Sequence, residues 1–262
     1  MRERDAQDAL KSFRDHFTLP EGVVYLDGNS LGPLPTATPA RLAQVAEREW
    51  GEGLIRSWNT AGWIDMPQRI GNKIARLIGA DAGEVIVTDS TSVNLFKVLA
   101  AAVKMNAGRL IILSQRDNFP TDLYMAQGLI GLMDGGHELR LVDAGNIVTA
   151  IDDDTAVVML THVNYRNGAM HDMAGITAQA HAKGALVIWD LAHSAGAMPV
   201  ALNAAQADFA IGCGYKYLNG GPGAPAFVFV AKQHQANFPQ PLTGWLGHAN
   251  PFAFDWEYTP AD

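Results

Sequence analysis

Seven short apolar runs, separated by segments with helical periodicity, constrain the fold of this chain more than any other feature of its sequence. A continuously apolar run is typical of a strand that is buried on both faces, as in a parallel sheet covered by helices. The runs are residues 84–88, 109–114, 139–142, 156–161, 185–190, 209–212 and 226–230, and the clearest helical segments are 93–105, 121–133 and 173–183. We therefore expect an α/β fold with a mostly parallel seven-stranded sheet flanked by helices. A loop of Gly and Pro residues joins the last two runs, which leaves room for one of these strands to run antiparallel.

The two ends of the chain follow a different pattern. Residues 3–17, 39–50 and 68–78 have helical periodicity, whereas the turn-rich segment 25–35 is not expected to form regular structure. After residue 231 the periodicity is lost, and the chain ends without a closing helix or strand. We predict an N-terminal segment, a large domain and the start of a truncated C-terminal region, with the bounds 1–60, 61–250 and 251–262.

The composition excludes several classes of protein. The net charge is −8 at pH 7 and no basic run offsets it, so binding to nucleic acid or to an anionic membrane is not expected. The single Cys213 excludes a disulfide framework, and His162, His171 and His181 lack zinc-ligand spacing, so no metal site is predicted. The sequence also shows no secretory signal and no membrane-spanning run, which favours a reducing, cytoplasmic compartment.

One lysine stands in a tight loop directly after the strand predicted at residues 209–212. Lys216 lies between Tyr215 and Tyr217 in a run of small residues, where loss of solvent can free the amine as a nucleophile. Asp190 ends a strongly apolar strand, and a buried carboxylate there needs a partner such as a protonated ring nitrogen. A lysine that can bond to an aldehyde, together with an acid that can pair with a pyridine nitrogen, suggests a site for pyridoxal 5′-phosphate (PLP). For Lys216 taken alone, the alternative is an ordinary surface lysine. For Asp190 taken alone, the alternative is a structural ion pair.

Other polar segments also follow predicted strands, where ligands of open α/β sheets bind. Thr91 and Ser92 directly precede the helix predicted at residues 93–105, where hydroxyls and backbone N–H groups bind phosphate, although for these residues alone an ordinary helix cap is the better explanation. Phe119 could stack on a flat ring, although for this segment alone a helix start with Pro120 near its first turn is the better explanation. His193 follows a third strand. Because these features fall at one predicted sheet edge, we expect them to form one site.

With these segments assembled, the chain resembles the kynureninases, PLP enzymes of the aspartate-aminotransferase fold type. The matching segments are residues 26–32, 91–95, 118–122, 190–193, 215–219 and 244–248, in the family order. The Asp-Gly-Asn-Ser-Leu-Gly and Tyr-Lys-Tyr-Leu-Asn segments are specific when they occur together. The resemblance implies that the large domain binds PLP, that the N-terminal segment carries a substrate-side loop, and that the small C-terminal domain is missing.

The resemblance also implies a role for each matched residue. Lys216 would bond to the cofactor aldehyde, Asp190 would pair with the pyridine nitrogen, and Tyr215 is the candidate acid near the substrate carbonyl. Phe119 would stack on the ring, and His193 would support Asp190 or the ring hydroxyl. The predicted cofactor-binding residues are Thr91, Ser92, Phe119, Pro120, Thr121, Asp122, Thr161, Asp190, His193, Tyr215, Lys216 and Trp245. Within this set, the phosphate would be held by Thr91, Ser92, Tyr215 and Trp245. The residues expected to wrap the substrate's aromatic end are Asn29, Ser30, Leu31 and Gly32.

The implied reaction is the hydrolysis of L-kynurenine, or its 3-hydroxy form, to anthranilate, or 3-hydroxyanthranilate, and L-alanine. It would be a step of tryptophan catabolism on the kynurenine pathway towards NAD biosynthesis, carried out by a homodimer. Family members continue beyond residue 262 and supply an arginine for the substrate's α-carboxylate, which has no counterpart here. Two alternatives stay open. One is a truncated, non-catalytic remnant that binds PLP or dimerises, and the other is a different lyase of this fold type, such as a cysteine desulfurase relative.

Overall fold

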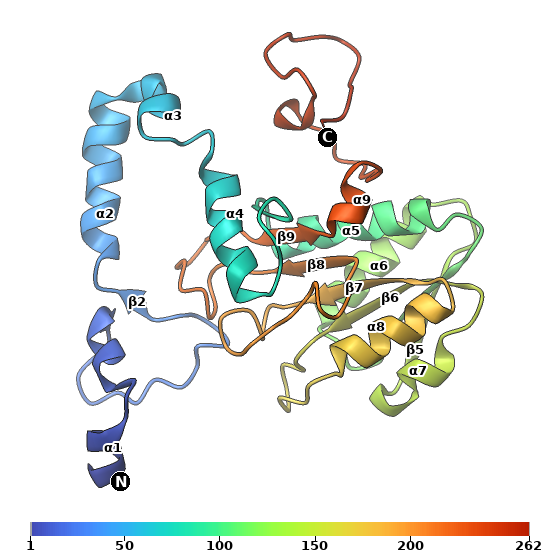
Figure 1. Ribbon diagram of the computed structural model, residues 1–262, viewed down its shortest axis with the longest axis horizontal. Coiled ribbons are helices and arrows are strands. Elements are labelled where there is room, and N and C mark those ends of the chain that lie inside the picture. The colour runs from blue at the N-terminus through green and yellow to red at the C-terminus, as the bar shows by residue number, and fades with distance from the viewer. Residues whose placement is uncertain (1, 262) are drawn as a thin grey trace.

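A seven-stranded sheet forms the centre of the computed structural model, which describes residues 2–261 (Figure 1). The strand order is β3-β9-β8-β7-β6-β4-β5. Six strands share one direction, and β9 runs antiparallel to both of its neighbours. The strands are β3 (Val85–Val87), β4 (Ile111–Gln115), β5 (Glu138–Val142), β6 (Thr155–Thr161), β7 (Leu186–Asp190), β8 (Phe209–Gly212) and β9 (Phe227–Val230).

Helices cover both faces of the sheet, and every strand except the edge strand β3 contributes to two hydrophobic cores. In β6, Val158 and Leu160 join the core under α4, α7 and α8, whereas Val157 and Met159 join the core under α5 and α6. Every residue of β6 is buried, because helices cover both faces of the sheet. Apolar residues therefore follow one another along the centre of the strand instead of alternating with polar ones. The helices are α4 (Met66–Leu77), α5 (Thr91–Met105), α6 (Pro120–Leu132), α7 (Ile147–Ala150) and α8 (Met173–Ala182).

The predicted fold class, a mostly parallel seven-stranded sheet flanked by helices, is confirmed. Each strand predicted from an apolar run, and each of the three helices predicted between them, agrees with the observed element to within two residues. The antiparallel strand is β9. The loop between β8 and β9 contains no helix to carry the chain back across the sheet, so the two strands pair antiparallel.

The N-terminal part is less regular than predicted. The single helix expected at residues 3–17 is two short pieces, α1 (Arg2–Gln7) and the 3₁₀ helix η1 (Lys11–His16). The break follows from Asp8, whose Oδ1 accepts a hydrogen bond from Leu10 N at 2.9 Å and so competes with the helical backbone pattern.

Two further predictions for the N-terminal part need correction. The helix expected at residues 39–50 begins as α2 (Thr38–Gln44) and continues as the π-helix η2 (Val45–Glu52). The turn-rich segment is mostly irregular, but its end forms a two-residue strand that pairs with residues 17–18. The sequence pattern did not predict this strand, because the pairing depends on a segment distant along the chain. The paired strands are β1 (Phe17–Thr18) and β2 (Leu34–Pro35).

Six short helices have no counterpart in the prediction. Each has three or four residues, which is too few for a period of 3.6 residues to be seen. They are η3 (Leu54–Arg56), α3 (Ser57–Thr60), η4 (Ala144–Asn146), α7 (given above), α9 (Lys232–Gln235) and η5 (Trp245–Gly247).

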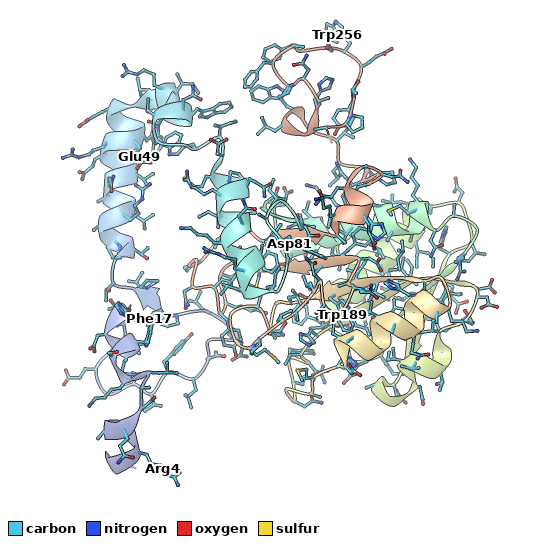
Figure 2. All side chains as sticks on the ribbon, in the orientation of Figure 1. Arg4, Phe17, Glu49, Asp81, Trp189 and Trp256 are labelled. Atoms are coloured by element: carbon cyan, nitrogen blue, oxygen red, sulfur yellow. The ribbon has the colours of Figure 1, made fainter. Side chains whose placement is uncertain are left out.

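Two segments stand away from the sheet, the α2–η2 arm drawn in blue and the C-terminal segment drawn in red (Figure 1). Large apolar side chains on both are open to solvent: Leu42 is 62% exposed, Trp50 66% and Trp256 103%. Figure 2 shows Trp256 at the tip of the C-terminal segment. Exposed apolar groups of this kind mark surfaces that contact other chain segments or molecules. The predicted division at residues 60 and 250 stays a prediction, and Met1 and Asp262 lie outside the described residues. Among residues 2–261, no helix combines the length and the apolar character that a membrane crossing requires.

The winding of the sheet places a crevice at the carboxyl ends of its parallel strands. The chain adds β5 on one side of β4 and then returns to add β6 on the other side. Where the connections from two neighbouring strands run in opposite directions, their loops diverge and leave a crevice at the carboxyl ends of the strands. Ligands of open α/β sheets bind in this crevice. The loops after β3, β4, β7 and β8 all reach this edge.

Candidate active site

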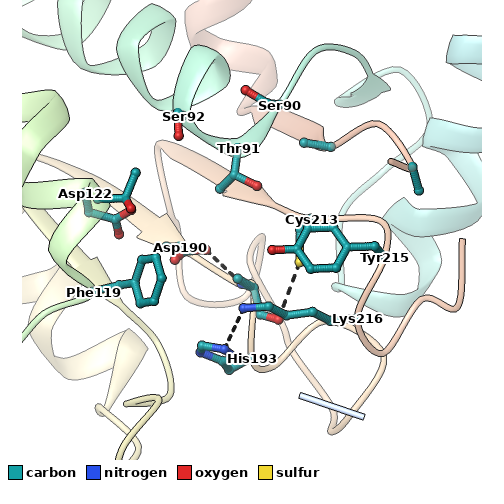
Figure 3. Close-up of a pocket in the computed structure, with 14 residues that line it drawn as sticks. Ser90, Thr91, Ser92, Phe119, Asp122, Asp190, His193, Cys213, Tyr215 and Lys216 are labelled. Carbon is teal, nitrogen blue, oxygen red and sulfur yellow. Dashed lines mark hydrogen bonds between the residues drawn. The ribbon is translucent and has the colours of Figure 1, made fainter. Parts of the chain in front are cut away.

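A cavity of about 230 Å³ lies at the carboxyl edge of the sheet (Figure 3). The loops after β3, β4, β7 and β8 enclose it, together with the segment that enters β9. Because β9 is antiparallel, it begins at the edge where its neighbours end, and Ala224 and Ala226 therefore join the wall. Nine of the predicted residues line this cavity: Thr91, Ser92, Phe119, Thr121, Asp122, Asp190, His193, Tyr215 and Lys216.

Lys216 points into the cavity from the short loop after β8. The residue is 8% exposed, and its Nζ lies 2.7 Å from His193 Nε2 (Figure 3). Burial, followed by the charge of Lys216, lowers the pKa of His193 to about 4, so the imidazole is neutral at pH 7. A neutral Nε2 can accept a hydrogen bond from the lysine ammonium, and this contact directs the amine into the cavity.

Two buried carboxyl groups lie together at the cavity wall. Asp190 ends β7 and Asp122 stands in the first turn of α6; they are 4% and 3% exposed. The hydroxyl of Thr161 lies between them, with Oγ1 3.3 Å from Asp122 Oδ2 and 3.4 Å from Asp190 Oδ2, and its nearest acceptor is Asn118 Oδ1 at 2.5 Å. Burial raises the pKa of both carboxyls, and the charge of Asp190 raises the pKa of Asp122 further. A cation placed against Asp190 would offset the cost of burying its negative charge.

The amino end of α5 forms another wall of the cavity, above the carboxyl groups and Lys216 in the view of Figure 3. Ser90 is the N-cap residue, and its Oγ accepts a hydrogen bond from Val93 N at 3.3 Å. Thr91 and Ser92 are the first helical residues, and their side chains line the cavity. A helix of 15 residues brings unpaired backbone N–H groups and the positive end of its dipole to this wall. With two hydroxyls beside them, these groups suit a phosphate.

Two aromatic rings flank the lysine amine. Lys216 Nζ lies 5.7 Å from the ring centre of Phe119 and 5.8 Å from that of Tyr215. Figure 3 shows the two rings on opposite sides of the open space, with Asp190 between them. Burial raises the pKa of the Tyr215 phenol, so this group keeps its proton at pH 7 and can donate it.

The turn segment at residues 27–32 packs against the lysine loop. Gly32 N donates a hydrogen bond to Tyr215 O at 2.9 Å, and a Cβ at Gly32 would lie 2.2 Å from Lys216 O. Only glycine permits this approach. The predicted substrate-side residues Asn29, Ser30, Leu31 and Gly32 therefore lie behind the lysine loop rather than in the wall of the cavity itself.

Three predicted cofactor residues lie outside the cavity wall. Pro120 is the first residue of α6, and Thr161 stands beneath the wall, where it holds the two carboxyl groups. Trp245 lies in the C-terminal segment, 45% exposed, with its ring stacked on Phe254 at 5.9 Å and near Trp58 at 5.8 Å. Within one chain the structure does not bring Trp245 to the phosphate wall, because the chain leaves the sheet after β9 and α9.

Two residues that shape the site, Asn118 and Cys213, were not among the predicted site residues. Asn118 accepts a hydrogen bond from Phe119 N at 2.8 Å and donates one to Ser114 Oγ at 3.1 Å, which orders the loop that carries Phe119. Cys213 lines the cavity beside Lys216, and burial raises the pKa of its thiol. Two weak signals in the sequence point to these residues. Asn118 is a polar residue directly before the ring-stacking candidate Phe119, and Cys213 is a small residue near the candidate nucleophile Lys216.

The side chains of this cavity fit the chemical groups of PLP. A buried amine suits the aldehyde, the amino end of α5 suits the phosphate, and Phe119 suits the flat ring. The carboxyl pair of Asp122 and Asp190 suits a protonated ring nitrogen, which would supply the positive charge that this pair needs. The donor set could therefore hold PLP without a change of residue.

Solved structures share this fold. A C-DES lysine variant with glycine covalently linked to its PLP cofactor superimposes with a TM-score of 0.78 at 17% identity, over 95% of this chain and 66% of that one. The apo cysteine desulfurase from Thermococcus onnurineus NA1 gives a TM-score of 0.74 at 22% identity, over 89% of this chain and 60% of that one. The fold is thus that of the large domain of fold-type-I PLP-dependent enzymes. At these identities the likeness concerns the fold alone.

The sequence narrows this class to one family. The family model described as aminotransferase class-V matches residues 24–248, and the chain belongs to that family. Within it, the chain is 59% identical over 263 residues to the kynureninase of Pseudomonas fluorescens and 58% identical over 261 residues to that of Burkholderia pseudomallei. The resemblance to kynureninases inferred from short motifs is confirmed. Each alignment takes in 98% of this chain, which spans 63% of the length of these relatives.

Proposed function

We propose that this chain is the PLP-binding part of a kynureninase, which hydrolyses L-kynurenine or 3-hydroxykynurenine to the matching anthranilate and L-alanine. The observation that carries the proposal is a buried Lys216 beside a neutral His193 and near Asp190, in a chain 58–59% identical to kynureninases. The reaction would belong to tryptophan catabolism.

The walls of the cavity assign the parts of the cofactor. Lys216 would attach PLP through its aldehyde, and Asp190 would hold the ring nitrogen in its protonated form. Thr91, Ser92 and the amino end of α5 would bind the phosphate, and Phe119 would stack on the ring. These roles are supported by the positions of the side chains around one cavity.

Bound PLP supplies an electron sink for the carbon that carries the substrate amine. Lys216 Nζ would take the proton from that carbon, and the neutral His193 Nε2 beside it would accept a hydrogen bond from the protonated lysine. Asp190 would hold the ring nitrogen in its protonated form. The hydrolysis would add water to the γ-carbonyl and break the Cβ–Cγ bond, so that the acyl carbon leaves as the carboxylate of anthranilate and Cβ gains a proton to become the methyl group of L-alanine.

Tyr215 is placed to give a proton on the substrate side. Its phenol is protonated at pH 7, since burial raises its pKa, and the ring flanks Lys216. The turn at residues 27–32 would support the substrate's aromatic end by fixing the Tyr215 and Lys216 backbone from behind, through the hydrogen bond from Gly32 N to Tyr215 O.

A homodimer in the cytoplasm is part of the same proposal. The support is the family resemblance, together with the exposed apolar side chains of the α2–η2 arm, such as Leu42 and Trp50. Light scattering of the purified protein at micromolar concentration would give the mass. A monomer at all concentrations would remove this part of the proposal and leave the PLP site untouched.

The experiment is to add PLP to the purified chain, record the absorbance spectrum, reduce with borohydride and map the labelled peptide. We expect a visible band and a label on Lys216. The variant Lys216→Ala should lose both, whereas Lys183→Ala, a half-exposed surface lysine paired with Asp153, should keep both. A label on another lysine, or none on a folded chain, would contradict the proposed site.

Turnover is measured separately, by the fluorescence of anthranilate released from kynurenine. Release by the wild-type chain, and none by Lys216→Ala, is expected. Labelling of Lys216 without turnover, in this chain and in a longer one extended to the length of its relatives, would favour the non-catalytic PLP-binding protein. Release of sulfide from cysteine would favour the desulfurase alternative, which the buried Cys213 thiol with its raised pKa opposes.

A further inference from the structure

The loop after β4 and the loop after β6 are fastened to each other beside the candidate active site. Asn164 Nδ2 donates to Asp117, with Nδ2 3.4 Å from the backbone oxygen and 3.3 Å from Oδ2. At the base of the loops, His171 Nε2 lies 2.6 Å from Gln115 Oε1. The second loop is also closed on itself, since Val163 and Met170 form an isolated antiparallel bridge. These contacts place the tip of the second loop against the first.

The tip of the second loop carries an aromatic ring that touches a cavity residue. The rings of Tyr165 and Phe119 meet edge to face, with centres 5.2 Å apart and planes at 86°. Phe119 lines the cavity, whereas Tyr165 lies outside its wall. Tyr165 therefore contacts the ring that faces the ligand without taking part in the cavity itself.

The Phe119 ring needs such a support. Its backbone is ordered by the hydrogen bond from Phe119 N to Asn118 Oδ1, but this bond leaves the two side-chain torsions free. Edge-to-face contact with a fixed ring restricts both torsions and selects one orientation of the plane. A stacking partner that is already oriented loses less entropy when a flat ligand binds.

Tyr165 is itself held in place. The Asn164 Oδ1 accepts a hydrogen bond from Arg166 N at 2.9 Å, which shapes the backbone on either side of the tyrosine. Arg166 Nε donates to Tyr165 Oη at 2.6 Å, and the guanidinium carbon lies 5.3 Å from the ring centre. The loop thus presents Tyr165 to Phe119 in a defined pose.

We infer that Tyr165 is a positioning residue, which sets the orientation of the Phe119 ring and thereby the affinity of the site for the flat ring of PLP. The inference rests on the proposed function, because it requires PLP to be the ligand of this cavity. It assigns to the loop at residues 162–172 a part in cofactor binding that its position outside the cavity does not reveal.

The test is a titration of the purified chain with PLP, followed by absorbance and by the circular dichroism of the cofactor band. We expect Tyr165→Ala to weaken PLP binding by about threefold to tenfold, as the strength of an edge-to-face pair suggests, and to reduce the induced circular dichroism. Tyr165→Phe keeps the ring and should stay within about twofold of the wild type. Tyr124→Ala, which removes a tyrosine that is 61% exposed on α6, is the matched control and should bind as the wild type does.

A double-mutant cycle separates positioning from a general loss of structure. In the Phe119→Ala background, Tyr165→Ala should cause no further loss, because the ring it orients is gone. Tyr165→Leu, which fills the space without an aromatic edge, keeps the test informative if Tyr165→Ala fails to fold, and should weaken binding in the same way.

The outcomes distinguish two failures. If the wild-type chain binds PLP and folded Tyr165→Ala and Tyr165→Leu bind it equally well, the inference is wrong and the proposed function stands. An equal loss with and without Phe119 would also overturn it. If a folded wild-type chain takes up no PLP, the proposed function fails and the inference fails with it.

Discussion

Asp190 and Asp122 show that residues well placed to bind a ligand can lower the stability of the ligand-free protein. Both carboxyls are buried within hydrogen-bonding reach of one hydroxyl, and burial raises the pKa of each, with the charge of Asp190 raising that of Asp122 further. Asp190 was predicted because a carboxylate at the end of an apolar strand needs a partner. Its neighbour Asp122 was predicted through the family motif, whereas the pairing of the two comes from the packing of α6 on the sheet edge.

Replacing Asp190 should therefore separate stability from function. We expect Asp190→Asn to leave the stability of the PLP-free chain unchanged or to raise it by about 1–2 kcal/mol, because the cost of burying the Asp190 carboxyl disappears and an amide oxygen can still accept from Ala192 N. The same variant should slow PLP-dependent exchange of the substrate's α-proton by roughly 100-fold or more, since the ring nitrogen loses its anion.

Chemical denaturation without PLP and proton exchange followed by NMR check these two expectations. Asp122→Asn is the matched control, because it removes the other buried carboxyl while leaving the Asp190 carboxyl in place. An unchanged exchange rate in Asp190→Asn would remove the assignment of Asp190 to the ring nitrogen.

At the scale of elements, α5 and the turn segment determine the shape of the site. The predicted helix begins two residues late, because its apolar periodicity starts at Val93, and the structure places the cap at Ser90 rather than at Thr91 or Ser92. Ser90 caps the helix through its hydrogen bond with Val93 N, and the cap directs the free N–H groups of the first turn at the cavity. The same short contact thus supports both the helix and the proposed phosphate site.

Ser90→Ala should lower the free energy of unfolding by about 1 kcal/mol, because one N–H of the first turn loses its acceptor. Urea denaturation of the PLP-free chain measures the change. Ser92→Ala is the control within the same turn, since Ser92 lies inside the helix, where alanine is favourable. A stability of Ser90→Ala equal to that of the wild type would show that the cap is not formed in solution.

Gly32→Ala tests the contact between the turn segment and the lysine loop. The new Cβ would stand 2.2 Å from Lys216 O and from Asn219 Oδ1, so the backbone must move apart. We expect a loss of about 1–3 kcal/mol in stability and weaker PLP binding, measured by denaturation and by titration. Gly128→Ala serves as a control for the opposite case, an exposed glycine of α6 without a positive φ and with nothing within 4 Å of the new Cβ. Normal PLP binding by Gly32→Ala would show that the two segments are not coupled.

At the scale of the whole molecule, buried histidines link stability to pH. Burial lowers the pKa of His162 to about 4 from an ordinary value of 6.5, and His162 is 5% exposed. Between these values the unfolded chain binds a proton at this residue that the folded chain does not, so its contribution to stability is lost as the pH falls from 6.5 towards 4. The full difference amounts to about 3 kcal/mol. His193 acts in the same direction, whereas the Asp122–Asp190 pair acts in the opposite direction.

The variant His162→Phe isolates this contribution. It keeps a flat ring beside Trp189, whose ring centre lies 6.0 Å from that of His162, and it removes the titration. Its stability relative to the wild type should rise by up to about 3 kcal/mol between pH 6.5 and pH 4. Denaturation curves of the PLP-free proteins at both pH values give this difference. A difference that does not change with pH would mean that His162 titrates normally in the folded protein.

The sequence by itself determined the sheet and the chemistry of its edge. Continuous apolar runs can be buried only between two layers of helices, and Lys216 and Asp190 stand out because each follows such a run. The tertiary structure decided what lies beside them: the neutral partner His193 for the lysine, the second carboxyl Asp122, the antiparallel direction of β9, and the contact of Tyr165 with Phe119. It also decided that Trp245 lies away from the cavity. These relations depend on segments far apart along the chain, and the free energy of such contacts is set by packing, which no local pattern of residues records.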